Sequence, residues 1–83
     1  MVQGFTKRVI FSSKTIDGRG DRDRLEDSLS SLDGVRDVNV DTDAHTVEIT
    51  FDPTVISELP LQTEVERLGY KIDSSEEQTE LPL

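Results

Sequence analysis

The chain of 83 residues contains no cysteine, and glycine and proline are sparse, with five and three residues. Without cysteine there is no disulfide, no thiolate metal site, no iron–sulfur cluster and no thiol catalysis. No apolar run approaches the roughly 20 residues that a membrane-spanning helix needs. Residues 1–5 also lack the charged and apolar regions of a signal peptide. We therefore expect one small soluble domain in the cytoplasm, without membrane insertion.

Acidic residues outnumber basic ones twofold, with 18 Asp and Glu against nine Lys and Arg, for a formal charge of -9. A surface of this sign repels phosphate backbones, so nucleic acid is not an expected partner. It attracts cations and basic protein surfaces, over a range that salt shortens. The preference for Asp among the acids and for Arg over Lys is also typical of halophilic proteins. On that interpretation the charge reflects a habitat rather than a ligand.

One amphipathic helix is expected between residues 21 and 34. Leu25, Leu29 and Leu32 recur at i, i+4 and i+7, which places them on one stripe of a helix. Asp21 is a favourable N-cap residue, and its carboxylate suits the positive end of the helix dipole. Gly34 is expected to end the helix in the left-handed conformation.

A second helix is expected over residues 57–68, where apolar residues again recur at helical spacing before a glycine. Apolar residues that alternate with polar ones predict strands at residues 5–11, 35–40 and 47–51, and a short strand at 70–72. The order β-α-β-β-α-β predicts an α+β, ferredoxin-like fold, in which two helices cover one face of a four-stranded antiparallel sheet. Residues 5–72 form the expected domain, and the acidic residues 73–83 an expected disordered tail.

Residues 25–41, followed by Val47-Glu48-Ile49 and Leu68-Gly69-Tyr70, resemble the heavy-metal-associated domain family. That family includes copper chaperones and the N-terminal domains of metal-pumping P-type ATPases. Its members share a Gly-Val step after the first helix, a V-x-x-V-x-V strand and a Gly-Tyr after the second helix. All three features are present here, so the resemblance implies the same fold.

The family's metal motif, Met-x-Cys-x-x-Cys, precedes the first helix. Aligned from Gly34 without a gap, it places Ile16 on the methionine, Gly18 on the first cysteine and Asp21 on the second. Cu(I) requires thiolates, which a glycine and a single carboxylate do not replace. The resemblance therefore implies the fold without the family's copper chemistry, and we expect no cofactor.

The same loop contains three carboxylates that could take part in a hard-cation site, Asp17, Asp21 and Asp23, because oxygen ligands suit Mg, Ca or Mn. Three arginines lie among them: Arg19, Arg22 and Arg24. Interleaved opposite charges are also typical of a solvated surface that pairs with itself. Both interpretations remain open from the sequence.

A second acidic stretch, residues 37–48, places oxygen-bearing residues at several positions of a calcium loop. The position that requires glycine is Thr42, and the valine alternation predicts a β-hairpin instead. His45, the only histidine, lies at the tip of that hairpin. We expect it to be a solvated turn residue, at a tip that lies away from the loop before the first helix or at most lateral to it.

No catalytic motif is present, so the leading hypothesis is a monomeric, non-enzymatic module for protein interaction or regulation. A protein of a metal-transport system is the candidate partner. In the family, docking involves the metal loop and both helix ends. This implies partner contacts by Arg19, Arg22, Arg24 and Tyr70. The alternative is a metal-trafficking protein with Asp or His ligands, or with ligands that a partner supplies.

Overall fold

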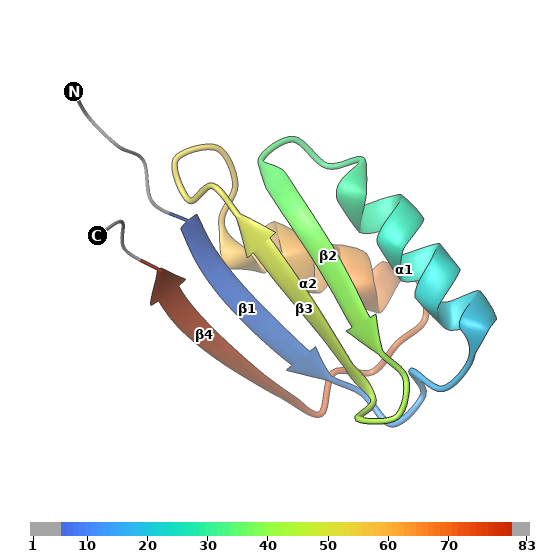
Figure 1. The fold of residues 1–83 in the computed structure, drawn as a ribbon. Coiled ribbons are helices and arrows are strands. Elements are labelled where there is room, and N and C mark those ends of the chain that lie inside the picture. The colour runs from blue at the N-terminus through green and yellow to red at the C-terminus, as the bar shows by residue number, and fades with distance from the viewer. Residues whose placement is uncertain (1–5, 81–83) are drawn as a thin grey trace.

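The computed structural model describes residues 6–80 and confirms the ferredoxin-like fold (Figure 1). The elements in chain order are β1 (Thr6–Ser12), α1 (Arg19–Ser30), β2 (Val35–Asp41), β3 (Thr46–Phe51), α2 (Glu58–Arg67) and β4 (Ser74–Glu80). The strands form one antiparallel sheet in the order β2-β3-β1-β4, so β2 and β4 are its edges. None of the helices in this part of the chain is long and apolar enough to cross a membrane.

The core lies between the sheet and the two helices, and it is built from the side chains that the alternation predicted. The inward residues of β1 and β3 and the apolar stripes of both helices are fully buried or nearly so: Val9, Phe11, Val47, Ile49, Phe51, Leu25, Leu29, Leu61 and Val65. Each buried side chain of this size contributes about 1.5–3 kcal/mol relative to an exposed one. Burial of these side chains therefore fixes the pairing of β1 with β3 and the position of the helices.

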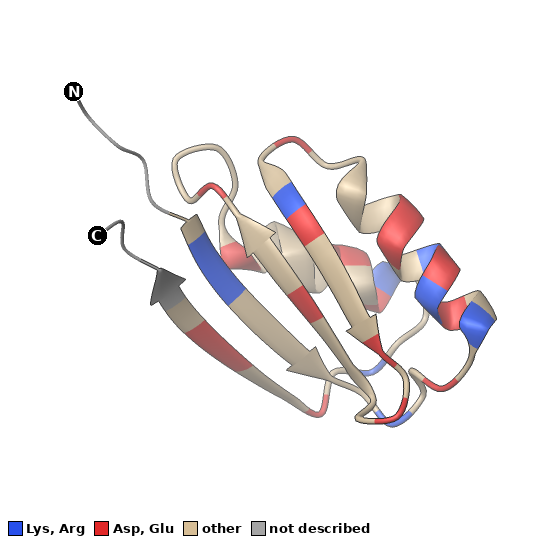
Figure 2. Ribbon diagram, viewed as in Figure 1, with Lys and Arg blue, Asp and Glu red and all other residues tan. Residues whose placement is uncertain are grey.

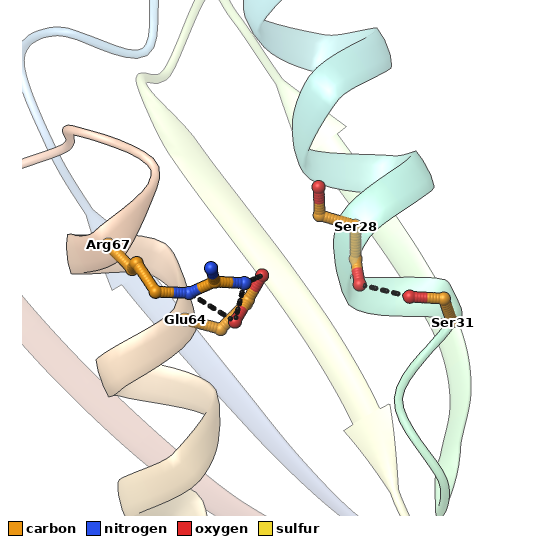
Figure 3. Close-up of polar contacts among 4 residues, drawn as sticks. All are labelled: Ser28, Ser31, Glu64 and Arg67. Carbon is orange, nitrogen blue, oxygen red and sulfur yellow. Dashed lines mark hydrogen bonds and ion pairs between the residues drawn. The ribbon is translucent and has the colours of Figure 1, made fainter.

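Gly34 has the predicted left-handed conformation, but it does not end α1 as predicted, because the C-cap residue is Ser31, three positions earlier. The helix ends at Ser30, and the hydroxyl of Ser31 donates a hydrogen bond to the carbonyl oxygen of Ser28 at 2.8 Å (Figure 3). Gly34 then adopts a φ of +93°, the left-handed conformation expected for it. The turn is packed against the segment between β3 and α2, because the Gly34 carbonyl oxygen accepts a hydrogen bond from the Asp52 N–H at 2.8 Å.

The last strand differs from the prediction. It spans Ser74–Glu80 rather than residues 70–72, and it pairs with β1 from Ser12 opposite Ser74 to Thr6 opposite Glu80. The prediction of a disordered tail from residue 73 is therefore wrong for residues 74–80, and the domain extends beyond residue 72. The described side chains of this edge strand, at residues 74–78, are polar and exposed, and the strand has no apolar alternation, so its pattern resembled that of a tail. Phe5 and residues 81–83, also covered by these predictions, lie outside the described residues.

Candidate functional site

Three connections meet at one end of the sheet, shown at the lower right of Figure 1. We call this region the loop end and define it as residues 13–24, 41–45 and 69–73. Backbone hydrogen bonds join its parts. The Ser13 N–H donates to the His45 carbonyl oxygen at 2.9 Å, and the Asp73 N–H donates to the carbonyl oxygen of Ser12, the last residue of β1 before the loop, at 2.7 Å. The loop before α1, which aligns with the family's metal motif, is therefore held between two other loops.

Asp21, a residue of α1, holds the loop before the helix through hydrogen bonds of its side chain. Gly18 is the N-cap residue, and Asp21 lies at the third helical position, so the prediction of Asp21 as N-cap was wrong by three residues. Glycine offers no side chain to cap the helix, and the carboxylate reaches back instead. Asp21 Oδ2 accepts hydrogen bonds from the N–H groups of Asp17 at 3.1 Å and Gly18 at 3.2 Å. This is the reciprocal half of a capping box.

The other carboxylate oxygen binds the chain on the far side of the loop. The Tyr70 hydroxyl donates to Asp21 Oδ1 at 2.6 Å, across 49 positions of sequence. The Tyr70 side chain is 5% exposed, so the hydroxyl is held in place by packing. Asp21 thus accepts three hydrogen bonds at the position where the family has its second cysteine.

The electrostatics match this arrangement. The hydrogen bond from Tyr70 is the largest cause that lowers the pKa of Asp21 below 3.8, and the hydrogen bond from the Asp17 N–H is the next. Burial, followed by the hydrogen bond to Asp21, raises the pKa of Tyr70 to about 12. Between these limits the carboxylate stays an acceptor and the phenol stays a donor. The bond between them therefore persists over the whole neutral range of pH.

His45 occupies a different place from the one expected. Its Nδ1 lies 2.8 Å from the carbonyl oxygen of Ile16, and its side chain is half-buried. The hairpin tip therefore lies against the loop before α1. The prediction of a solvated tip away from that loop is wrong, and of the two placements expected only the lateral one fits. Ile16 is fully buried, and the backbone on both sides of this contact is bonded as well, since the Ser13 N–H donates to the His45 carbonyl oxygen. His45 has a φ of 58°, a conformation in which histidine is enriched, but this signal does not identify the contact.

The structure does not gather the predicted cation ligands. The side chains of Asp17 and Asp23 are exposed, whereas both oxygens of Asp21 already accept hydrogen bonds from the protein. Within residues 6–80, no three His, Cys, Asp or Glu side chains are grouped so that they could hold a metal ion. A hard-cation site at Asp17, Asp21 and Asp23 stays a prediction, and an ion there would share the Asp21 oxygens with three hydrogen-bond donors of the protein.

The basic residues divide into two groups. Four form ion pairs: Lys7 with Glu77 at 3.7 Å, Arg8 with Glu48 at 3.3 Å, Arg36 with Asp52 at 3.2 Å and Arg67 with Glu64 at 2.7 Å (Figure 3). The other five belong to the loop end: Lys14, Arg19, Arg22, Arg24 and Lys71. All five are exposed, and none forms an ion pair with a carboxylate of the described chain.

The loop end therefore carries five of the nine basic residues but only six of the 18 acids (Figure 2). Three of the expected partner contacts, Arg19, Arg22 and Arg24, lie on the first turns of α1 with their side chains in solvent. Tyr70, the fourth, is instead buried against the loop. Sequence reasoning found the arginines but missed Lys14 and Lys71, which only the fold brings to the same end.

Residues 10–71 match the profile of the heavy-metal-associated domain. None of the curated protein sequences compared with the chain matches it significantly. Among solved structures, oxidized MerP from Ralstonia metallidurans CH34 is similar, with a TM-score of 0.74, 21% identity, and coverage of 83% of this chain and 99% of that one. The matched region is nearly the whole of that protein, so the two chains share the fold over its full length.

Two structures from Bacillus subtilis are also similar. The N-terminal domain of a potential copper-translocating P-type ATPase, in the Cu(I)-loaded state, has a TM-score of 0.73 and 25% identity over 86% of this chain and 91% of that one. The N-terminal soluble domains of CopA give a TM-score of 0.77 and 24% identity over 86% of this chain. The match spans 48% of that longer CopA chain.

Proposed function

Because the chain belongs to the heavy-metal-associated domain family, we propose that it is a non-enzymatic docking module, which binds a partner protein through the loop end without a thiolate metal site of its own. The partner is a protein of a metal-transport system. Two observations support this proposal. The chain shares its fold with a domain of a potential copper-translocating ATPase, and its loop before α1 contains no cysteine.

The three hydrogen bonds accepted by Asp21 carry the proposal. A thiolate-bound metal ion would cross-link the two ends of this loop. Here one carboxylate connects the N–H groups of Asp17 and Gly18 to the Tyr70 hydroxyl. The loop therefore has a fixed shape that depends on no metal, which supports docking that does not require metal either.

The charges of the loop end support the choice of surface. Five exposed basic side chains that form no ion pair within residues 6–80 are available to carboxylates of another protein. Complementary charges raise the rate of association and fix the orientation of docking, and salt weakens both effects. The rest of the molecule is strongly acidic and repels the same partner, so a partner with an acidic surface is directed to this end.

The test is a titration of the isotope-labelled chain with the N-terminal metal-binding domain of the copper-transporting ATPase of the same organism, in excess metal chelator. We expect NMR shifts at the amides of Arg19, Arg22 and residues 69–72. The variant Arg19→Glu/Arg22→Glu is expected to bind roughly tenfold more weakly, a loss of about 1.4 kcal/mol.

The matched control reverses two arginines that are already paired elsewhere, Arg36→Glu/Arg67→Glu, with the same change in net charge. It is expected to weaken binding much less. Shifts that appear only after metal is added, or equal losses in the two double variants, would show that the loop end is not a metal-independent docking surface.

A further inference from the structure

The strand β2 forms one edge of the sheet and pairs only with β3. The register of that pairing is interrupted between Val35 and Asp37 and is regular from Asp37 to Asp41. Apart from this pairing, no backbone hydrogen bond joins residues 36–41, which we call the β2 edge, to any other part of residues 6–80. The N–H and C=O groups of alternate residues therefore point away from β3 and are open to another strand.

The valines of β2 on the helix side of the sheet are incompletely covered. Val38 pairs in register with Ile49, whose side chain is buried in the core, so Val38 lies on the helix side. Val35 pairs with the buried Phe51 and lies on the same side. Both valines pack against the core but are only half-buried, since β2 has no strand beyond it. A strand added to β2 therefore gains apolar burial wherever its own residues on this side are apolar.

The other face of β2, away from the helices, is acidic. Asp37, Asn39 and Asp41 lie on this face, and all three are exposed. Neither aspartate forms an ion pair in the described part of the chain. The one basic residue of the strand, Arg36, is already paired with Asp52 at 3.2 Å. A strand added to β2 therefore meets unpaired carboxylates, which favour basic side chains on this face.

We propose that the β2 edge is a second docking surface, which binds one extended segment of a partner protein whose residues alternate between apolar and basic. The apolar residues cover the half-buried valines, the basic residues pair with Asp37 and Asp41, and the backbone continues the ladder of the sheet. Binding here depends on backbone pairing, which docking through the loop end does not require. Asp41 also belongs to the loop end, whereas Asp37 belongs to the β2 edge alone.

Two other pairings are less favourable. The opposite edge strand, β4, has only exposed polar side chains at residues 74–78, so a strand added there covers no apolar residue on either face. A second copy of the chain, paired antiparallel through β2, would bring its own aspartates to the same face as Asp37 and Asp41. Like charges on neighbouring strands destabilise such a pair. A basic and apolar segment is therefore the occupant that the β2 edge favours.

The test is an NMR titration of the isotope-labelled whole chain with a capped peptide of alternating lysine and valine, long enough to span residues 37–41. We expect saturable shifts at the amides of the β2 edge and none at residues 74–78. The control is the same peptide with methylated backbone nitrogens, which keeps the charges and side chains but cannot donate hydrogen bonds to a ladder. We expect the control peptide to bind at least about tenfold more weakly.

The variant Asp37→Lys is expected to bind the unmethylated peptide about tenfold more weakly than the wild type. The matched control, Glu76→Lys, makes the same change in charge on the same face of the sheet but on β4, and should bind nearly as the wild type. Equal binding of the two peptides, equal losses in the two variants, or shifts spread over acidic residues outside the β2 edge would overturn the proposal. Dimerisation of the peptide-free chain through β2, measured by translational diffusion, would also overturn it.

Discussion

The double variant Gly18→Cys/Asp21→Cys is expected to bind one equivalent of Cu(I), with an affinity on the order of a hundredfold or more above that of the wild type. The two positions align with the cysteines of the family's metal motif. An added Cβ at Gly18 meets no atom within 4 Å, and its φ of -132° suits any residue. Both thiols would lie at the N-terminal end of α1, where the helix dipole lowers thiol pKa values and favours thiolates.

The measurement is competition for Cu(I) with a coloured chelator under anaerobic conditions. The control is Gly18→Ser/Asp21→Ser, which introduces side chains of similar size without thiols. A double cysteine variant that takes no more Cu(I) than the serine variant would show that the loop lacks the geometry of the family's metal loop. Addition of Ca, Mg and Mn to the wild type tests the hard-cation prediction at Asp17, Asp21 and Asp23 in the same samples.

Replacement of Gly34 by alanine is expected to lower the free energy of unfolding by about 2–4 kcal/mol. Two costs add at this position. The φ of +93° is unfavourable for alanine, and its Cβ would lie 2.8 Å from Ile56 Cγ2 and 2.9 Å from Val55 Cβ. The carbonyl oxygen of Gly34 itself accepts the hydrogen bond from the Asp52 N–H, so the turn cannot shift freely.

Thermal unfolding measures this loss, which for a domain of this size corresponds to about 10–25 °C in Tm. Gly20→Ala is the matched control, because Gly20 lies within α1 and an added Cβ there meets nothing within 4 Å. It is expected to stabilise the protein by about 0.5–1 kcal/mol. Equal Tm values for the two variants would contradict the account of the turn after α1.

Burial explains which parts of the fold were predictable. The inward side chains of β1 and β3 and the leucine stripe of α1 must avoid water. Apolar residues therefore recur at regular spacing in the sequence of these elements. Gly34 was predictable for a related reason, because its backbone conformation excludes most other residues. The strand β4 shows no such spacing, since its described side chains are all exposed. Its place is decided by backbone pairing with β1, which every residue except proline can make.

The site was predictable in position but not in its contacts. Alignment with the metal motif located the loop and identified Asp21 as the residue at a cysteine position. The bond from Tyr70 to Asp21 spans 49 positions, and the contact of His45 with Ile16 spans 29. Such contacts depend on how the loops pack at the end of the sheet, and the spacing of residues along the sequence does not predict that packing.

The central claim is that the Asp21 carboxylate fixes the loop through its hydrogen bonds, and the pKa of Asp21 tests this claim most directly. The measurement follows the side-chain carboxyl carbon of Asp21 by NMR during an acid titration of the wild type and of Tyr70→Phe.

Because the folded-state pKa is lowered, the carboxylate contributes stability above its ordinary pKa, and this contribution is lost as the pH falls through the folded-state pKa. In the wild type we predict a pKa below the ordinary 3.8 and, at neutral pH, protected amides at Asp17 and Gly18. In Tyr70→Phe we predict a pKa closer to the ordinary value and a stability lower by about 1 kcal/mol. An ordinary pKa for Asp21 in the wild type, or a pKa that Tyr70→Phe leaves unchanged, would contradict the account.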